Sequence, residues 1–570
     1  MSQLREVLSK IGNNCMNTQD DSPLDSTAET LRHLVGSSRG LLPNKEPNGS
    51  PGEVPRGQVI ALKDRSPRGY YRQHTLFRFF DEIPQLFPFI KETTDEWLKP
   101  RGITLRKEKS AIAVTIAPNP QHNALEDLLP PKEHTDALIS FYIDHVEKIH
   151  RVVHIPSFKR EYSSCWIPNQ PRHPAMTALI LAMISISTPI STEDSTSNYR
   201  SMPPKWIAAC DAWLAQHATK GRKLVYYQVA CLVYLAKRIN TIRKKRFWIE
   251  TGSLVQNAML DGLHMEEPNS PAHSPYVKET KRRIWAVVRE LDLQNSFEYE
   301  LPTLLHNLQC SITDPANVDD EEMENSTPRP KTLDHMTDIS YQALSSRSWK
   351  LRLEISKRLF STGTAKALPY DEVLQYTHRL TQALDSLPLW CKKISMDGSG
   401  AADSLLISAL LQFQLKECIL AIHRPYLQGG NSHSSLSEMI CYHAARDVLL
   451  MNRELGKHGM QNLLFFREDL LVASLSLTRL SLNQPRGSTA VITADLESTI
   501  ALLQQCYPFA EDRLSEKNDI FQTKSVDSAE HSQLPQQMDD YTNFDMDWTN
   551  IDIDWQSGAV WDMELPWGSP

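Results

Sequence analysis

Apolar residues between about 136 and 510 recur with the period of an α-helix. Residues 255–262 and 284–291 each carry small or apolar side chains at positions i, i+3, i+4 and i+7, which lie on one face of a helix. The run 405–422 is apolar nearly all round, as expected of a helix in the centre of a large bundle. Strand-like alternation between turn signals is scarce. The sequence therefore predicts an all-α domain.

The remainder of the chain differs in composition from this helical part. Residues 1–66 are rich in Ser, Asn, Pro and Gly, so we expect them to be mostly disordered apart from a short leucine-bearing stub. Inside the helical part, the acidic stretch 314–337 and the stretch 429–435 are expected to be surface loops. The predicted order is a disordered region at 1–66, an aromatic-rich docking segment at 67–110, a linker at 111–135, a large helical domain at 136–510 and a disordered acidic tail at 511–570.

Charge is distributed unevenly along the 570 residues, whose net charge is −8. From Ser525 to the end there are ten Asp or Glu residues and no Lys or Arg, so this segment carries −10 and the rest of the chain about +2. A terminal block of one sign usually marks an interaction tail.

Aromatic residues alternate with the carboxylates of this tail. On a helix, Phe544, Trp548, Ile551 and Trp555 would share one face, and Trp561 follows. Burying each ring would contribute roughly 1.5–3 kcal/mol, whereas ordering each residue costs roughly 1–2 kcal/mol. We therefore expect an activation segment that binds a coactivator groove weakly. The alternative is an acidic tail that only aids solubility.

No motif for catalysis, a cofactor or a metal stands out. The nine cysteines are dispersed without a C-x-x-C pair, and phosphate-binding and nucleophile-elbow motifs are absent. His150 and His154 have the spacing of two metal ligands on a helix, but they are more simply two histidines at a helix end. His264 could be an acid or base, or a packing group. Asp292 could be a catalytic carboxylate, or could pair with an arginine at 282, 283 or 289.

Several other features bear on where the protein acts. The longest apolar run, 175–186, is too short to span a bilayer. The dispersed cysteines fit a reducing compartment and the first 30 residues are too polar for a signal peptide, so a soluble intracellular protein is expected. The basic cluster Arg243, Lys244, Lys245 and Arg246 is either a nuclear import signal or the solvated side of a helix.

Five short motifs, taken in order, resemble the fungal-specific transcription factor domain, also called the middle homology region. They are Val152-Val-His-Ile-Pro-Ser-Phe158, Gly262-Leu-His264, Lys281-Arg-Arg-Ile-Trp285 with Leu291-Asp292, Asp314-Pro-Ala-Asn317 and Ile422-His-Arg-Pro-Tyr426. The resemblance marks as structural residues Pro156, Phe158, Gly262, Arg282, Arg283, Trp285, Asp292, Arg424 and Pro425.

These motif residues also have roles that follow from their own chemistry. Trp285 is placed to anchor the core, and the arginines at 282 and 283 can meet helix-end carbonyls or acidic partners. Pro156 and Pro425 are expected to stop helices. These are architectural roles, so the resemblance implies a regulatory scaffold rather than a catalytic site.

Family members usually carry an N-terminal cluster of six cysteines that holds two zinc ions and reads DNA. Here only Cys15 precedes residue 165, so DNA contact is expected to be indirect or to come from a module absent from this chain. Residues 1–12 resemble the start of a coiled coil that would support a homo- or heterodimer. Either the cluster was lost or an upstream exon encodes it.

The resemblance thus implies a nuclear regulator of RNA polymerase II transcription of metabolic genes, such as those of a secondary-metabolite cluster. It would bind a coactivator or mediator-type protein through its tail and would use no cofactor and no membrane. The alternatives are a co-regulator without DNA contact and, from another class, a soluble helical enzyme or small-molecule-binding protein.

Overall fold

A computed structural model gives the fold of the central part of the chain. It describes residues 125–167, 172–191, 198–218, 222–240, 247–266, 274–324, 329–360, 368–392, 401–427, 432–460 and 469–482, together with 494, 495, 497 and 499. Every regular element within these residues is helical, which confirms the predicted fold class. The predictions made for residues 1–124, for the basic cluster at 243–246 and for the acidic tail lie outside the described residues.

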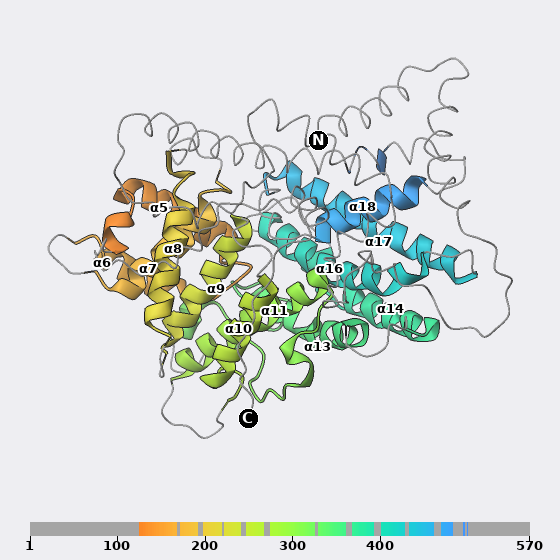
Figure 1. Ribbon diagram of the computed structural model, residues 1–570, viewed down its shortest axis with the longest axis horizontal. Helices are drawn as coiled ribbons and strands as arrows, with labels where there is room; N and C mark the ends of the chain where they lie inside the picture. The colour runs from red at the N-terminus through yellow and green to blue at the C-terminus, as the bar shows by residue number, and fades with distance from the viewer. Residues whose placement is uncertain are drawn as a thin grey trace, which may run out of the picture.

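The first half of the fold is a group of helices on one side of the molecule, coloured orange to yellow-green in Figure 1. Helix α7 lies at its centre and packs against α5, α8 and α9. The elements of this half are η4 (Leu125–Leu128), α5 (Lys132–Phe141), the π-helical turn η5 (Tyr142–Val146), α6 (Ile155–Ser164), α7 (Pro174–Ser187), α8 (Pro203–Gln216), α9 (Leu224–Ile239) and α10 (Phe247–Leu260).

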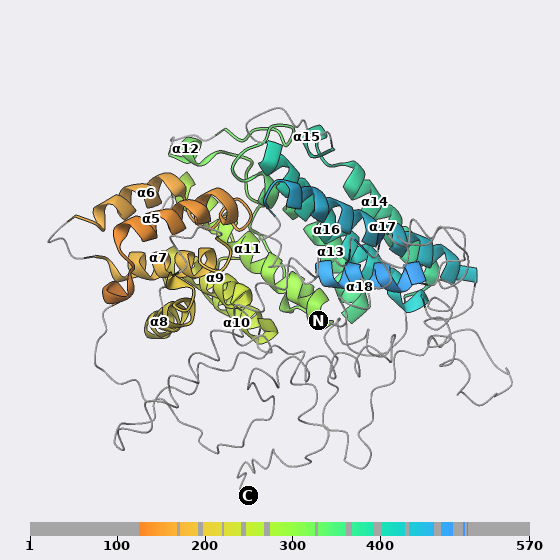
Figure 2. The same ribbon diagram turned by 90° about the horizontal axis from the view of Figure 1, so that it is seen from above.

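The second half lies beside the first and is reached through the 25-residue helix α11 (Pro275–Tyr299), which packs against α9 and α10 on one side and α13 on the other (Figure 2). Its remaining elements are η8 (Leu304–Asn307), α12 (Asp320–Met323), α13 (Ser340–Phe360), α14 (Tyr370–Asp385), α15 (Leu389–Lys392), α16 (Ala401–His423), η9 (Arg424–Tyr426), α17 (Ser432–Lys457) and α18 (Asp469–Leu482).

Helix α16 is the central helix of this second half, as its sequence predicts. It packs against α13, α14, α17 and α18. The stretch Ala402–Tyr426 is long and apolar enough to cross a membrane, but 83% of its apolar 18-residue window is buried inside the protein. Its apolar surface is therefore covered by neighbouring helices, which is the usual reason for a helix that is apolar on all sides.

Helix ends follow local sequence signals. Gly262, predicted to lie on the apolar face of a helix, lies just beyond the end of α10 with a φ of +70°. Its N–H donates to the carbonyl of Met259, and the N–H of Leu263 donates to Ala258. This is the left-handed helix end that glycine adopts without a Cβ penalty.

The two motif prolines differ in position. Pro156 was expected to stop a helix, and that expectation is wrong: it lies in the first turn of α6, where the missing N–H has no helical acceptor in any case. His154 caps this turn by accepting a hydrogen bond from the N–H of Ser157. Pro425 lies in η9, directly after α16 ends at His423.

The stretch 314–337 is not simply a surface loop, which corrects the sequence-based expectation. Asn317, Val318, Asp320 and Met323 are all buried, and residues 320–323 form the short helix α12. The stretch is held down because its carboxylates meet arginines of the helical body, as described below. The expected loop at 429–435 is also shorter than predicted, since α17 begins at Ser432.

Candidate functional site

The buried carboxylate of Asp320 joins three separate parts of the chain. Arg151, which follows η5, reaches it at 2.6 Å, and Arg283 of α11 reaches its other oxygen at 2.5 Å. The backbone N–H of Ile155, at the start of α6, donates to the same carboxylate at 2.8 Å. All three charged side chains are 5% exposed or less. Asp320 therefore locks α12 onto α6 and α11.

This arrangement fixes the charge of Asp320. Burial by itself would raise the pKa of its carboxyl group, but the guanidinium groups of Arg151 and Arg283 outweigh burial and lower the pKa to about 2. The two positive charges and one negative charge are shielded from water. Without this carboxylate, the free-energy cost of burying either arginine would be larger.

A second buried carboxylate lies one helical turn before Arg151. Glu147 accepts hydrogen bonds from the hydroxyl of Tyr142 and, at 2.7 Å, from the backbone N–H of Val153. Burial raises the pKa of Glu147 to about 8, with Arg151 acting in the opposite direction. The turn at 147–153 is thus tied to η5 by a carboxyl group that favours its protonated form near neutrality.

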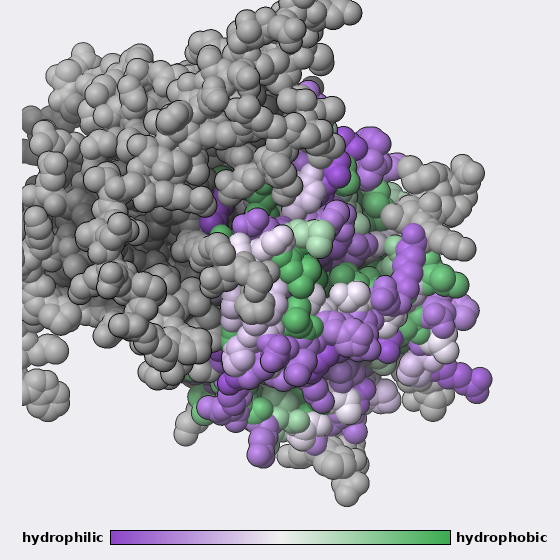
Figure 3. Space-filling view, turned by 90° about the vertical axis from the view of Figure 1, so that its right-hand side faces the viewer, coloured by the Kyte–Doolittle hydropathy of each residue, from purple (hydrophilic) through white to green (hydrophobic). Residues whose placement is uncertain are grey.

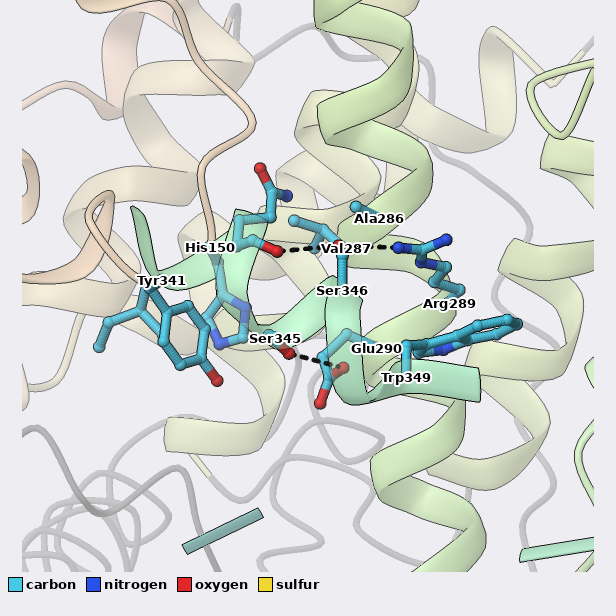
Figure 4. Close-up of a pocket in the computed structure, with 11 residues that line it drawn as sticks. His150, Ala286, Val287, Arg289, Glu290, Tyr341, Ser345, Ser346 and Trp349 are labelled. Atoms are coloured by element: carbon cyan, nitrogen blue, oxygen red, sulfur yellow. Dashed lines mark hydrogen bonds between the residues drawn. The ribbon is translucent and has the colours of Figure 1, made fainter. Parts of the chain in front are cut away.

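A small cavity lies where the two halves of the domain meet, between α11, α13 and the turn at 149–150 (Figure 4). Its volume of about 10 Å³ is room for about one water molecule. The lining is mixed, with aliphatic side chains beside polar and charged ones: Ile149, His150, Ala286, Val287, Arg289, Glu290, Tyr341, Gln342, Ser345, Ser346 and Trp349.

The floor of this cavity is a hydrogen-bonded network that connects α11, α13 and α16. Arg352 of α13 makes a two-pronged contact with Glu290 of α11, at 2.8 and 2.7 Å. Gln414 of α16 donates to Glu290 at 2.9 Å and to the hydroxyl of Tyr341 at 2.6 Å. Ser345 donates to the same glutamate, as Figure 4 shows.

The structure places the motif residues in the core and its hydrogen-bond network. Trp285 is 1% exposed, with its ring centroid 5.9 Å from that of His264, which supports the packing interpretation of that histidine. Phe158 is buried and stacks on Tyr162. Arg282 pairs with Glu266 and with Glu279. In η9, residues 424 and 425 are half-buried.

Asp292 departs from the expected arginine pairing. Arg282, Arg283 and Arg289 reach Glu266, Asp320 and Asp314 respectively. The carboxyl group of Asp292 instead lies near Thr303, Thr251 and the backbone N–H of Leu304. Burial raises its pKa and these three groups act to lower it, while its Oδ2 has no hydrogen-bond partner among the described residues. The pairing fails because the side of α11 that carries Asp292 faces α10 and the start of η8.

The histidine pair at 150 and 154 does not converge on a metal site. His154 uses one ring nitrogen toward Ser157 at 2.7 Å and the other toward the carbonyl of Asp320 at 2.8 Å, while His150 lines the cavity. Within the described part of the chain, no group of His, Cys, Asp or Glu residues is arranged to hold a metal ion.

Sequence reasoning missed the residues that organise this region, Glu147, Arg151 and Asp320. The amino-acid sequence holds a weak indication for two of them, Arg151 and Asp320. Arg151 directly precedes a recognised motif, and Asp320 stands in an acidic stretch that also contains the apolar Val318 and Met323. Because partners 37 to 169 residues apart must meet, their pairing shows only in the fold.

Part of this helical body resembles a known protein family. Residues 139–387 match the family described as the fungal specific transcription factor domain. Over these residues the chain is similar to that domain. The matched range contains four of the five motifs, and the later one at 422–426 lies beyond it.

Curated relatives of the chain are named as transcription factors. Transcription factor opdR of Penicillium oxalicum is 30% identical over 310 residues, which are 52% of this chain and 39% of that protein. Transcription factor lepE of Aspergillus flavus is 26% identical over 57% of this chain and 40% of its own length. The equisetin cluster transcription factor eqxF of Fusarium heterosporum is 23% identical over 61% of this chain and 52% of its own.

The chain thus spans about two fifths to one half of the length of these relatives. No solved structure matches it. In the region that matches this family, the buried charges connect helices to one another.

Proposed function

We propose that this chain regulates transcription by RNA polymerase II in the nucleus, acting on metabolic genes such as those of a secondary-metabolite cluster. The observation that carries the proposal is the family match at 139–387, which falls on a helical body whose motif residues are used for packing and ion pairing. The names of the relatives support it, including that of a cluster regulator. An enzyme is not favoured.

The proposed division of labour follows the predicted domains. The body at 136–510 is the regulatory scaffold, and the acidic–aromatic tail at 511–570 is the activation segment that contacts a coactivator or mediator-type protein. DNA contact is indirect or comes from a module outside this chain, and Arg243 to Arg246 serve as the import signal. A homo- or heterodimer fits this scheme.

Fusing residues 525–570 to an unrelated DNA-binding domain tests the activation role. We expect reporter expression above that of the DNA-binding domain alone, because the aromatic side chains remain available to a coactivator groove. Replacing Trp548 and Trp555 by Ala should abolish the signal. Trp567→Ala is the matched control, since Trp567 would lie about 100–120° away from those two positions on a helix.

Two results would count against the activation role: a fusion that gives no signal, or one that Trp548→Ala and Trp555→Ala reduce no more than Trp567→Ala does. For the regulatory role as a whole, deleting residues 525–570 from the full chain should change expression of its target genes. Unchanged transcript levels across the genome would contradict that role.

A further inference from the structure

Arg289 differs from the other buried arginines of the described fold in the carboxylate that it meets. Its side chain is 7% exposed, but its partner Asp314, at 2.6 Å, is 52% exposed. The other buried arginines each have at least one carboxylate partner that is 12% exposed or less, as for Arg151, Arg238, Arg283 and Arg352. Arg151 has an exposed second partner, Asp338, but it also keeps the buried Asp320. The charge of Arg289 is therefore neutralised from the solvent side by a group that can turn away into water.

The guanidinium group of Arg289 is held in place independently of Asp314. It lies over the ring of Trp349, 4.7 Å from the ring centroid, and donates to the hydroxyl of Ser346 at 2.8 Å. Figure 4 shows Arg289 between these two residues at the edge of the cavity. An arginine held flat by an aromatic ring is well suited to bind a planar carboxylate.

Two further polar groups of the cavity lining are left without partners. The side-chain oxygen of Gln342 and the indole N–H of Trp349 have no hydrogen-bond partner among the described residues. The two residues are 5% and 8% exposed, and both line the same cavity as Arg289. A buried polar atom without a partner costs roughly 1–3 kcal/mol. A carboxylate can accept a hydrogen bond from the indole N–H of Trp349, whereas the Gln342 oxygen, itself an acceptor, needs a hydroxyl group or a water as its donor.

We propose that this cavity is a binding site for the carboxylate of a small molecule, which displaces Asp314 from Arg289. Without ligand, the Asp314 carboxylate occupies the position beside Arg289 that the ligand carboxylate takes when it binds. The cavity itself holds only about one water, so the ligand gains its room from the departing side chain and extends toward solvent where Asp314 is exposed. Ala286 and Val287 offer an aliphatic surface for a short stem. The site goes beyond the proposed function and does not rest on it.

Titrating propionate into the full chain by calorimetry, at constant ionic strength, tests the site. Asp314→Ala should raise the affinity for propionate about tenfold or more, because the probe no longer competes with the internal carboxylate. Propionamide, which lacks the charge, should not bind. Adding Arg289→Gln to the Asp314→Ala variant should remove propionate binding while the helical circular dichroism is retained.

A matched control variant is available in the same chain. Asp447 is 53% exposed and pairs with Lys416, which is 8% exposed, so Asp447→Ala also uncovers a buried cation, but on helices α16 and α17. Propionate affinity should not change in this variant. The proposal is overturned if Asp314→Ala and Asp447→Ala have the same affinity for propionate, or if propionamide binds as well as propionate does.

Discussion

The carboxylate of Asp320 neutralises two arginines that have almost no access to water. Its replacement by Asn would leave Arg151 and Arg283 buried without full compensation. Removing one member of such a group costs about 3–5 kcal/mol. We expect a loss of this size in the free energy of unfolding of Asp320→Asn, measured with urea.

Glu324 provides the comparison for this change. It follows the same short helix, but its pair with Arg160 is exposed on both sides, at 42% and 62%. Glu324→Gln should leave the unfolding midpoint unchanged. If the two variants were equally stable, the buried group would not be holding α12 in place.

Glu147 should make the stability of the body depend on pH. Its carboxyl group has a folded pKa of about 8, raised by burial, against 4.5 for an ordinary glutamate. Between these values the folded state holds a proton that the unfolded state releases, so stability falls as pH rises, by about 1.4 kcal/mol per pH unit for one proton.

Glu147→Gln isolates this contribution, because glutamine resembles the protonated acid. We expect the variant to match the natural protein near pH 5 and to be the more stable of the two at pH 8, in urea unfolding at a series of pH values. Parallel pH profiles for the two proteins would mean that Glu147 does not titrate in this window.

At the scale of elements, the ion pairs between helices include both buried pairs and pairs exposed to solvent. Arg238 of α9 makes a two-pronged contact with Glu298 of α11 at 2.8 and 2.6 Å, and both side chains are 5% exposed or less. Arg238→Met would leave Glu298 uncompensated between these helices. We expect a cost of about 3–5 kcal/mol by chemical denaturation.

An exposed pair of the same chemistry serves as the control. Arg379 of α14 contacts Glu354 of α13 with two hydrogen bonds, but the two side chains are 45% and 46% exposed. Solvent screens this pair, so Arg379→Met should cost less than about 1 kcal/mol. Similar costs for both changes would show that burial does not set the strength of these contacts.

At the scale of the whole molecule, the predicted boundary after residue 510 is open to test. The acidic tail carries too much like charge to bury area of its own, so its deletion should change neither the urea midpoint nor the denaturant dependence of unfolding. A lower midpoint in the protein shortened to residue 510 would show that the tail packs on the body.

The amino-acid sequence was sufficient to predict the helical class and the central position of α16, because a helix that is apolar on all sides has to be buried by others. It also marked Trp285 as a core residue, since the apolar spacing around it places it on the inner face. Such features depend on neighbours within a few turns of one helix.

Only the tertiary structure decided which charges meet. The stretch 314–337 has the composition of a solvated loop, yet Asp320 is buried because Arg151 and Arg283 converge on it from distant parts of the chain. The carboxyl group of Asp292 likewise lies near Thr251 and Thr303 and does not pair with the arginines near it in sequence. The energy of a charge depends on burial and on partners across the fold, and local spacing determines neither of them.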